Sequence, residues 1–173
     1  MKTKFHVVLY GDSILKCDLI PKKHRWTNLL EKKLQQINNR KFVVSTKGIN
    51  GATSVDALSL IKKYVLKKKK DIIIFQFGIN DSWYFKSLNG LPNVNQKIFM
   101  NNLKIMIRKC KKFNIIKIYF LTYHCVSKKR VESNNKTINH NIKKYNSIIR
   151  SVSKKNKKVE VIDIEKETKN TSS

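Results

Sequence analysis

Three short stretches of this chain carry residue types that could perform acyl transfer. The stretch Tyr10-Gly11-Asp12-Ser13-Ile14 places a serine hydroxyl, a candidate nucleophile, at the end of an apolar run. Gly51 ends the stretch Gly48-Ile49-Asn50-Gly51, and its backbone N–H can approach a substrate closely because glycine has no side chain. Asn80, in Gly78-Ile79-Asn80-Asp81, offers an amide donor. Acyl transfer needs a nucleophile, a base and donors aimed at the developing oxyanion, so these stretches supply everything except the base.

Each of the three residues also has an ordinary structural interpretation. Ser13 could cap a helix, Gly51 could serve a turn, and Asn80 could form an Asx turn at a strand end. Their joint placement favours chemistry, because each follows one of three predicted strands in succession. The carboxyl ends of neighbouring parallel strands meet at one edge of a sheet, which is where such sheets bind ligands. We therefore expect Ser13, Gly51 and Asn80 to converge on one pocket.

The remaining elements alternate in type along the chain. Apolar runs predict strands at 5–10, 42–44, 72–77, 115–121 and 159–164, and apolar stripes at helical spacing predict helices within 26–37, 57–65, 99–110 and 138–152. The stretch from Thr53 to Asp56 has the spacing of a capping box. The run 72–77 shows no alternation, which indicates a central strand buried on both faces. This order predicts a single α/β domain over residues 1–164, with a five-stranded parallel sheet between helices, and a polar tail at 165–173.

The chain resembles the SGNH (GDSL) hydrolase family of serine esterases and acyl hydrolases. Three of its stretches are similar to that family's first three sequence blocks: Gly11-Asp12-Ser13-Ile14, Asn50-Gly51-Ala52-Thr53 and Gly78-Ile79-Asn80-Asp81. The resemblance implies a flavodoxin-like three-layer α/β/α sandwich, with Ser13 as nucleophile and Gly51 and Asn80 as oxyanion donors. It also implies a small-molecule or carbohydrate-linked ester as substrate. The nucleophile elbow of α/β-hydrolases fits less well, since its Gly-x-Ser-x-Gly pattern would need glycine at Leu15.

One family block is missing from the sequence. The last block, Asp-x-x-His after the fifth strand, supplies the catalytic acid and the histidine base, and no Asp-x-x-His occurs among the 173 residues. Without a base, a serine hydroxyl is a weak nucleophile. The missing block implies that the chain is a C-terminally truncated or decayed copy of a family member, or a member that uses another base.

The four histidines differ in their suitability as a substitute base. His124 follows the fourth strand at the correct edge of the predicted sheet and is the best candidate, although a loop histidine without a catalytic role also fits. His24 follows Ser13 in a loop and is conceivable. His6 begins the first strand, which puts it a strand length away, and His140 opens a helix and is expected to face solvent. We expect Asp163, at the end of the fifth strand, to be structural rather than the triad acid.

The walls of the expected pocket are less well defined. Asp12, Asp81, Trp83 and Tyr84 are candidate pocket residues, but the cluster Trp83-Tyr84-Phe85 fits a small hydrophobic cluster beneath a loop equally well. A second function class also stays open. A domain of this fold without a base could hold a ligand beside Ser13 without turning it over, as a catalytically impaired binding module.

The formal net charge is +27. A charge of this size favours nucleic acid or a lipid surface as partner, or else reflects a composition rich in lysine throughout. The lysine-dense stretches follow predicted helices, where cations stabilise helix C-termini, and they lack the interleaved aromatic residues of a base-stacking surface. We therefore expect a basic protein with no specific nucleic acid partner, and its lysine runs at the sheet edge opposite Ser13.

Composition bounds the remaining properties. The three cysteines, Cys17, Cys110 and Cys125, show no metal-ligand spacing and read as reduced thiols, so we expect a cytoplasmic protein with no cofactor and no metal. No stretch approaches the roughly 20 apolar residues of a membrane span, and the N-terminal apolar run is shorter than a signal-peptide core. The oligomeric state is not predicted.

Overall fold

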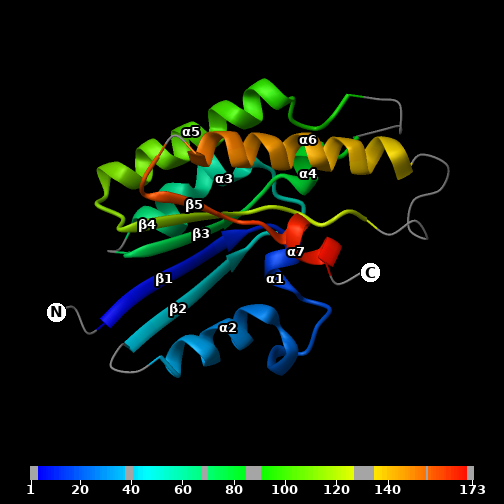
Figure 1. Cartoon of the computed structure of the whole chain (residues 1–173). Coiled ribbons are helices and arrows are strands. Elements are labelled where there is room, and N and C mark those ends of the chain that lie inside the picture. The colour runs from blue at the N-terminus through cyan, green and yellow to red at the C-terminus, as the bar shows by residue number, and fades with distance from the viewer. Residues whose placement is uncertain are drawn as a thin grey trace.

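The computed structural model of the chain describes residues 4–37, 41–67, 70–84, 91–126, 135–154 and 156–170. Five strands form one sheet: β1 (Lys4–Gly11), β2 (Lys41–Gly48), β3 (Ile72–Gln76), β4 (Lys117–Leu121) and β5 (Val159–Ile162). Every neighbouring pair is parallel, and the strand order is β2-β1-β3-β4-β5 (Figure 1). This is the order of flavodoxin-like sheets, and it confirms the predicted fold class.

Helices cover both faces of the sheet, as Figure 1 shows. One face carries α2 (Trp26–Gln35), and the other carries α3 (Ser54–Ile61), α5 (Gln96–Lys112) and α6 (Asn135–Lys154). The shorter pieces are α1 (Ser13–Lys16), the 3₁₀ turn η1 (Lys22–His24), the π-helical turn η2 (Lys62–Leu66), α4 (Ile79–Ser82) and α7 (Ile164–Asn170). The molecule is therefore a three-layer α/β/α sandwich.

Alternation along the central strands divides the core in two. On β1, Val8 and Tyr10 pack with the α3, α5 and α6 side, whereas Val7 and Leu9 pack with the α2 side. The division follows from the two-residue period of a strand, which points successive side chains to opposite faces. β3 lies in the middle of the sheet and contributes buried side chains to both clusters, as the uninterrupted apolar run 72–77 predicted.

The predicted capping box is present at the start of α3. The Thr53 side chain accepts from the backbone N–H of Asp56, and the Asp56 carboxylate accepts from the backbone N–H of Thr53 at 2.8 Å. β2 is longer than the apolar run 42–44 predicted, because its backbone pairs with β1 along the whole length from Lys41 to Gly48. An edge strand tolerates the polar side chains of that extension, since one side of it faces solvent.

The end of the chain differs from the polar tail that the sequence predicted. Residues 164–170 form α7, and Glu165 is only 4% exposed. Its carboxylate accepts hydrogen bonds from Arg150 at 2.7 Å and from Asn146 at 3.0 Å, and its backbone N–H donates to the Thr122 hydroxyl at 3.0 Å. These partners compensate the buried charge, so a segment of polar composition becomes part of the packed domain. The candidate Phe85 lies outside the described residues.

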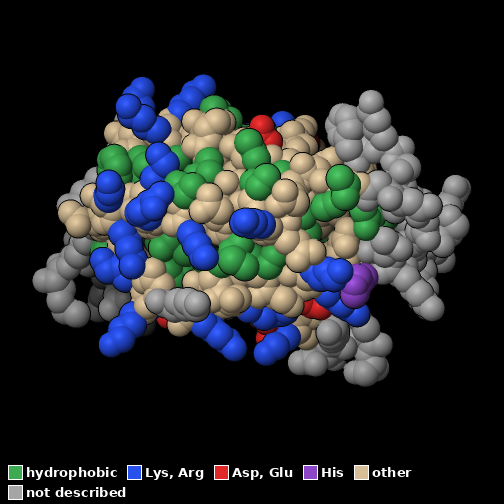
Figure 2. Space-filling view, turned by 90° about the horizontal axis from the view of Figure 1, so that it is seen from above, with side chains coloured by type: hydrophobic (Ala, Val, Ile, Leu, Met, Phe, Trp, Pro, Cys, Tyr) green, Lys and Arg blue, Asp and Glu red, His purple; other side chains and the backbone are tan. Residues whose placement is uncertain are grey.

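Some of the lysines lie in the last turns of helices. Lys109, Lys111 and Lys112 occupy the last turn of α5, and Lys32 and Lys33 occupy the last turn of α2. In a parallel sheet these helix ends precede the amino ends of strands, so they lie at the edge opposite Ser13 (Figure 1). Figure 2 shows Lys and Arg side chains scattered over the α5 and α6 face, with few acidic ones between them. Among the helices in the described ranges, none has the length and apolar character that crossing a bilayer requires.

Candidate active site

Ser13 is presented at the carboxyl end of β1. Asp12 caps α1, since its Oδ1 accepts from the Ile14 N–H at 2.9 Å, and Ser13 is the first residue of that helix. The Ser13 side chain is exposed, and its hydroxyl makes no hydrogen bond within the described part of the chain. β1 lies between β2 and β3, where the strand order reverses, which is the ligand-binding position of an open parallel sheet.

The loop after β2 brings Gly51 to the same edge. The Ile49 N–H donates to the Gly11 carbonyl at 2.9 Å, which joins this loop to the end of β1. Gly51 has a φ of 70°, a conformation that glycine adopts without strain. A Cβ at this position would meet no atom within 4 Å, and the Gly51 N–H has no hydrogen-bond acceptor among the described residues. An uncommitted backbone donor therefore lies at an open surface.

Asn80 is joined to this loop through its side chain and to Asn93 through its backbone carbonyl. Its Nδ2 donates to the Ala52 carbonyl at 2.9 Å, and its own carbonyl accepts from Asn93 Nδ2 at 2.8 Å. Gly78, with a φ of 141°, forms the turn that leads from β3 into α4. Because an amide nitrogen carries two hydrogens, the bond to Ala52 leaves one Asn80 donor for a ligand. The hydrogen bonds from Ile49 to Gly11 and from Asn80 to Ala52 thus join the loop of Gly51 to the ends of β1 and β3, whereas the convergence of Ser13, Gly51 and Asn80 on one pocket stays a prediction.

Asp81 is buried and connects neighbouring helices through hydrogen bonds. Both of its carboxylate oxygens accept from the Ser54 N–H at 3.0 Å, and the Ser54 hydroxyl accepts from Asn102 Nδ2 at 2.9 Å. The carboxylate therefore ties α4 to α3, with α5 joined through Asn102. Burial raises the pKa of Asp81 from 3.8 to about 6, against the opposing effect of the Ser54 hydrogen bonds.

Asp12 has a second partner that the sequence analysis missed. The Tyr123 hydroxyl, 111 residues away in sequence, donates to Asp12 Oδ2 at 2.5 Å. Burial raises the pKa of Asp12 to about 6, and burial together with the Asp12 charge raises the pKa of Tyr123 well above 10, so Tyr123 stays a donor. The position of Tyr123 immediately after β4, at the carboxyl edge of the sheet, is the signal that could have identified it.

A cleft of about 680 Å³ lies beside Ser13. Most of its lining is apolar, and the side chains that line it with Ser13 are Ile14, Cys17, Asp18, Leu19, Ile20, Trp26 and Asn50. The predicted pocket residues Asp12, Asp81, Trp83 and Tyr84 are not among them. Asp12 and Asp81 are buried in the network around α1 and α4, Trp83 is 39% exposed, and Tyr84 forms a backbone bridge with Pro92. Segment 17–26, rather than the aromatic cluster, forms the wall of this cleft.

The four histidines lie on different elements or loops. His124 follows Tyr123 after β4 and is exposed, His24 is exposed in η1, and His140 is exposed on α6, as expected. His6 lies in β1, where its backbone N–H donates to Asp71 Oδ2 at 2.8 Å. Across the ranges that the structure covers, no histidine side chain forms a hydrogen bond with Ser13, and no three His, Cys, Asp or Glu side chains gather as a metal site.

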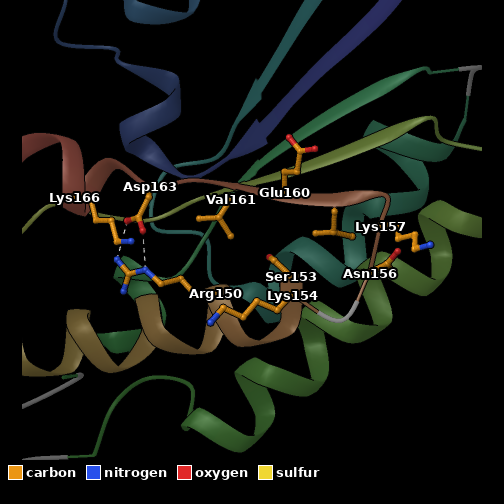
Figure 3. A pocket seen from close by; sticks show the side chains of 10 residues that line it. Arg150, Ser153, Lys154, Asn156, Lys157, Glu160, Val161, Asp163 and Lys166 are labelled. Carbon is orange, nitrogen blue, oxygen red and sulfur yellow. Dashed lines mark hydrogen bonds and ion pairs between the residues drawn. The ribbon is translucent and has the colours of Figure 1, made fainter.

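Asp163 is a structural ion-pair partner. Its carboxylate accepts from Arg150 Nε at 2.8 Å and Nη2 at 2.7 Å, and from the Thr122 hydroxyl at 2.9 Å. Figure 3 shows the Arg150 and Asp163 side chains joined by hydrogen bonds, and both line a cavity of about 500 Å³ between α6 and β5. The Arg150 hydrogen bonds lower the pKa of Asp163 to about 2. Both carboxylate oxygens are engaged, which agrees with the structural role expected from the sequence.

The chain is similar to a known protein family and to several solved structures. A family model described as GDSL-like lipase/acylhydrolase matches residues 9–172. A search of curated proteins finds no match. Among solved structures, an acetyl xylan esterase, AlAXEase, superposes with a TM-score of 0.76 at 24% identity, over 97% of this chain and 84% of that one. A catalytic mutant of Axe2, an acetylxylan esterase from Geobacillus stearothermophilus, gives 0.80 at 16% identity, over 97% and 80%. TesA gives 0.70 at 18% identity, over 90% and 76%.

Proposed function

The chain belongs to the GDSL-like lipase/acylhydrolase family, and we propose that it hydrolyses carboxylic esters with Ser13 as the nucleophile. One observation carries the proposal. An exposed serine begins a helix at the strand-order reversal, beside an open cleft, and the loop of Gly51 and the amide of Asn80 are hydrogen-bonded into the same edge. This arrangement offers a nucleophile and donors on one side of a ligand site.

The reaction follows from these groups. Ser13 Oγ attacks the ester carbonyl carbon and gives its proton to a base. The carbonyl oxygen becomes an oxyanion that accepts from the Gly51 N–H, from the second amide hydrogen of Asn80, and from the Ser13 N–H at the start of α1. Collapse breaks the bond to the alcohol, which leaves with the proton from the base. Water then attacks the acyl-enzyme by the same route and releases the acid.

The reaction also needs a base that takes the Ser13 proton. Within these 173 residues we assign it to His124, because this residue follows the fourth strand at the edge where Ser13 lies, and because its neighbour Tyr123 reaches Asp12. His140 makes a suitable control, since it is also exposed but lies on α6 and lines a different surface hollow.

The substrate class is a small-molecule or carbohydrate-linked ester. Two of the similar structures are named as acetyl xylan esterases, which favours acetylated sugars as the first substrates to examine. The cleft beside Ser13 has room for a short acyl or alcohol group, and Asp18 and Asn50 give it a polar margin.

The test is hydrolysis of p-nitrophenyl acetate and of acetylated xylooligosaccharides by the wild-type chain and three variants. Ser13→Ala and His124→Ala are expected to abolish turnover, whereas His140→Ala is expected to leave it unchanged. Turnover that depends on Ser13 but on none of the histidines would remove His124 as the base and leave Ser13 in place.

A second candidate function is ligand binding without turnover. It is favoured by the missing Asp-x-x-His and by the lack of a histidine hydrogen bond to Ser13 within the described ranges. It predicts that the wild-type chain and Ser13→Ala hydrolyse p-nitrophenyl acetate equally slowly, while calorimetry still detects binding of an acetylated xylooligosaccharide. That combination of results would replace the esterase proposal.

A further inference from the structure

We propose that Tyr123 is a positioning residue for Ser13 and acts through the Asp12 carboxylate. The inference deepens the proposed function and rests on Ser13 being the nucleophile. Its starting point is the 2.5 Å hydrogen bond from the Tyr123 hydroxyl to Asp12 Oδ2, between two side chains that are 2% and 0% exposed. Water cannot replace a partner at this depth, so each group depends on the other for its hydrogen bond.

Asp12 matters because the helix that it caps is very short. α1 has four residues, and a single helical turn has no stability of its own in water. Its conformation is maintained by the Asp12 cap on the Ile14 N–H and by the Cys17 N–H, which donates to the Ser13 carbonyl at 2.9 Å. Ser13 is the first residue of that turn. A rotation of the Asp12 carboxylate would therefore change the direction of the Ser13 hydroxyl and of the N–H that faces the oxyanion.

Tyr123 is in turn held from α6 and α7. Asn146 accepts from the Tyr123 N–H at 2.9 Å and donates to the Tyr123 carbonyl at 2.8 Å, which clamps the backbone on both sides. Asn146 also donates to Glu165 at 3.0 Å, and Arg150 donates to the same Glu165 oxygen at 2.7 Å. Through this network the C-terminal helix supports the residue that holds Asp12.

The charge of Asp12 gives the proposal a pH dependence. Three titratable groups interact with this carboxylate: Tyr123 through its hydrogen bond, and Asp81 and Cys17 through the negative charge of Asp12, which raises the pKa of each. The Tyr123 hydrogen bond favours the charged form of Asp12 and so opposes the effect of burial. Removing the hydroxyl should raise the pKa of Asp12 above its value of about 6. The acid limb of activity should then move to higher pH.

Tyr123→Phe is the direct test, because it deletes one oxygen and keeps the ring. Tyr10→Phe is the matched control. Its hydroxyl is also buried and donates to a backbone acceptor, the Ala57 carbonyl at 3.1 Å, but makes no contact with Asp12. For Tyr123→Phe we expect kcat on p-nitrophenyl acetate to fall about tenfold, as for loss of a charge-assisted hydrogen bond, with KM within about twofold. Tyr10→Phe should lower stability without changing kcat or the pH profile.

Two readouts do not need turnover. One is the rate at which a fluorophosphonate labels Ser13, measured by mass spectrometry, and the other is amide hydrogen exchange of Ile14, measured by NMR. In Tyr123→Phe the labelling should slow about tenfold and the Ile14 amide should exchange at least about tenfold faster, because the cap on that amide is loosened.

The outcomes separate the two proposals. Wild-type rates of labelling and of Ile14 exchange in folded Tyr123→Phe would overturn the positioning role. If the wild-type chain neither turns over esters nor accepts the label, the proposed function fails, and Ile14 exchange alone still decides whether Tyr123 holds Asp12. If Tyr10→Phe speeds Ile14 exchange as much as Tyr123→Phe does, the effect of Tyr123→Phe reflects a general loss of stability. That result would also overturn the proposal.

Discussion

Replacing Asp81 with asparagine is expected to stabilise the protein at neutral pH. The side chain is fully buried, and its carboxylate accepts from the Ser54 N–H. In Asp81→Asn the amide oxygen can still accept from that N–H. The substitution therefore removes a buried charge while it keeps the shape of the side chain and the hydrogen bond to the Ser54 N–H.

The expected gain follows from the pKa of Asp81, which burial raises from 3.8 to about 6. A pKa of Asp81 that is about two units higher in the folded than in the unfolded state corresponds to about 3 kcal/mol of unfolding free energy. Relaxation of the protein around the charge reduces this gain to about 1–2 kcal/mol. The folded state binds its proton more tightly than the unfolded state, so the wild-type chain loses stability as pH rises from about 4 through about 6. The advantage of Asp81→Asn should grow over that window and stay constant above it.

Urea unfolding at pH 4.5, 5.5, 6.5 and 7.5 measures this difference. Asp163→Asn is the control, because Arg150 lowers the pKa of Asp163 to about 2, and the loss of that ion pair should destabilise the protein equally at all four pH values. An Asp81→Asn variant that is no more stable than wild type at pH 7.5 would refute the reasoning. So would an advantage that does not change between pH 4.5 and 7.5.

Two further predictions concern the loop after β2 and the basic surface. Gly48→Ala should cost about 2–3 kcal/mol of unfolding free energy, since its Cβ would lie 2.5 Å from the Lys16 Cβ and 2.6 Å from the Lys16 backbone. Gly51→Ala should cost only about 1 kcal/mol, because its Cβ meets no atom and only the left-handed φ is unfavourable. Urea unfolding measures both costs, and similar urea midpoints for the two variants would contradict this order. Nucleic acid binding should be weak, independent of sequence and steeply weakened by salt, because the lysine-dense stretches lack the interleaved aromatic residues of a stacking surface. Fluorescence anisotropy at two salt concentrations measures it, and tight binding at high salt would show a specific site.

Much of the fold could be predicted because its determinants are local. The uninterrupted apolar run of β3, the helical stripes and the capping box at Thr53 each require only a few neighbouring residues. The α7 helix could not be predicted in this way. Its composition is polar, and Glu165 is buried only because Arg150 and Asn146 are brought to it by the packing of α6 against β5.

The same division runs through the candidate site. The positions of Ser13, Gly51 and Asn80 after three successive strands could be predicted from the sequence, because a parallel sheet brings such strand ends to one edge whatever the details of packing. Tertiary packing, in contrast, brings Tyr123 to Asp12 across 111 residues and lines the cleft beside Ser13 with Leu19, Ile20 and Trp26. Those contacts depend on the register of β4 and on the path of the segment after α1. The pattern of neighbouring residues cannot predict the register of β4 or the path of that segment, because each depends on which distant surfaces of the chain pack together.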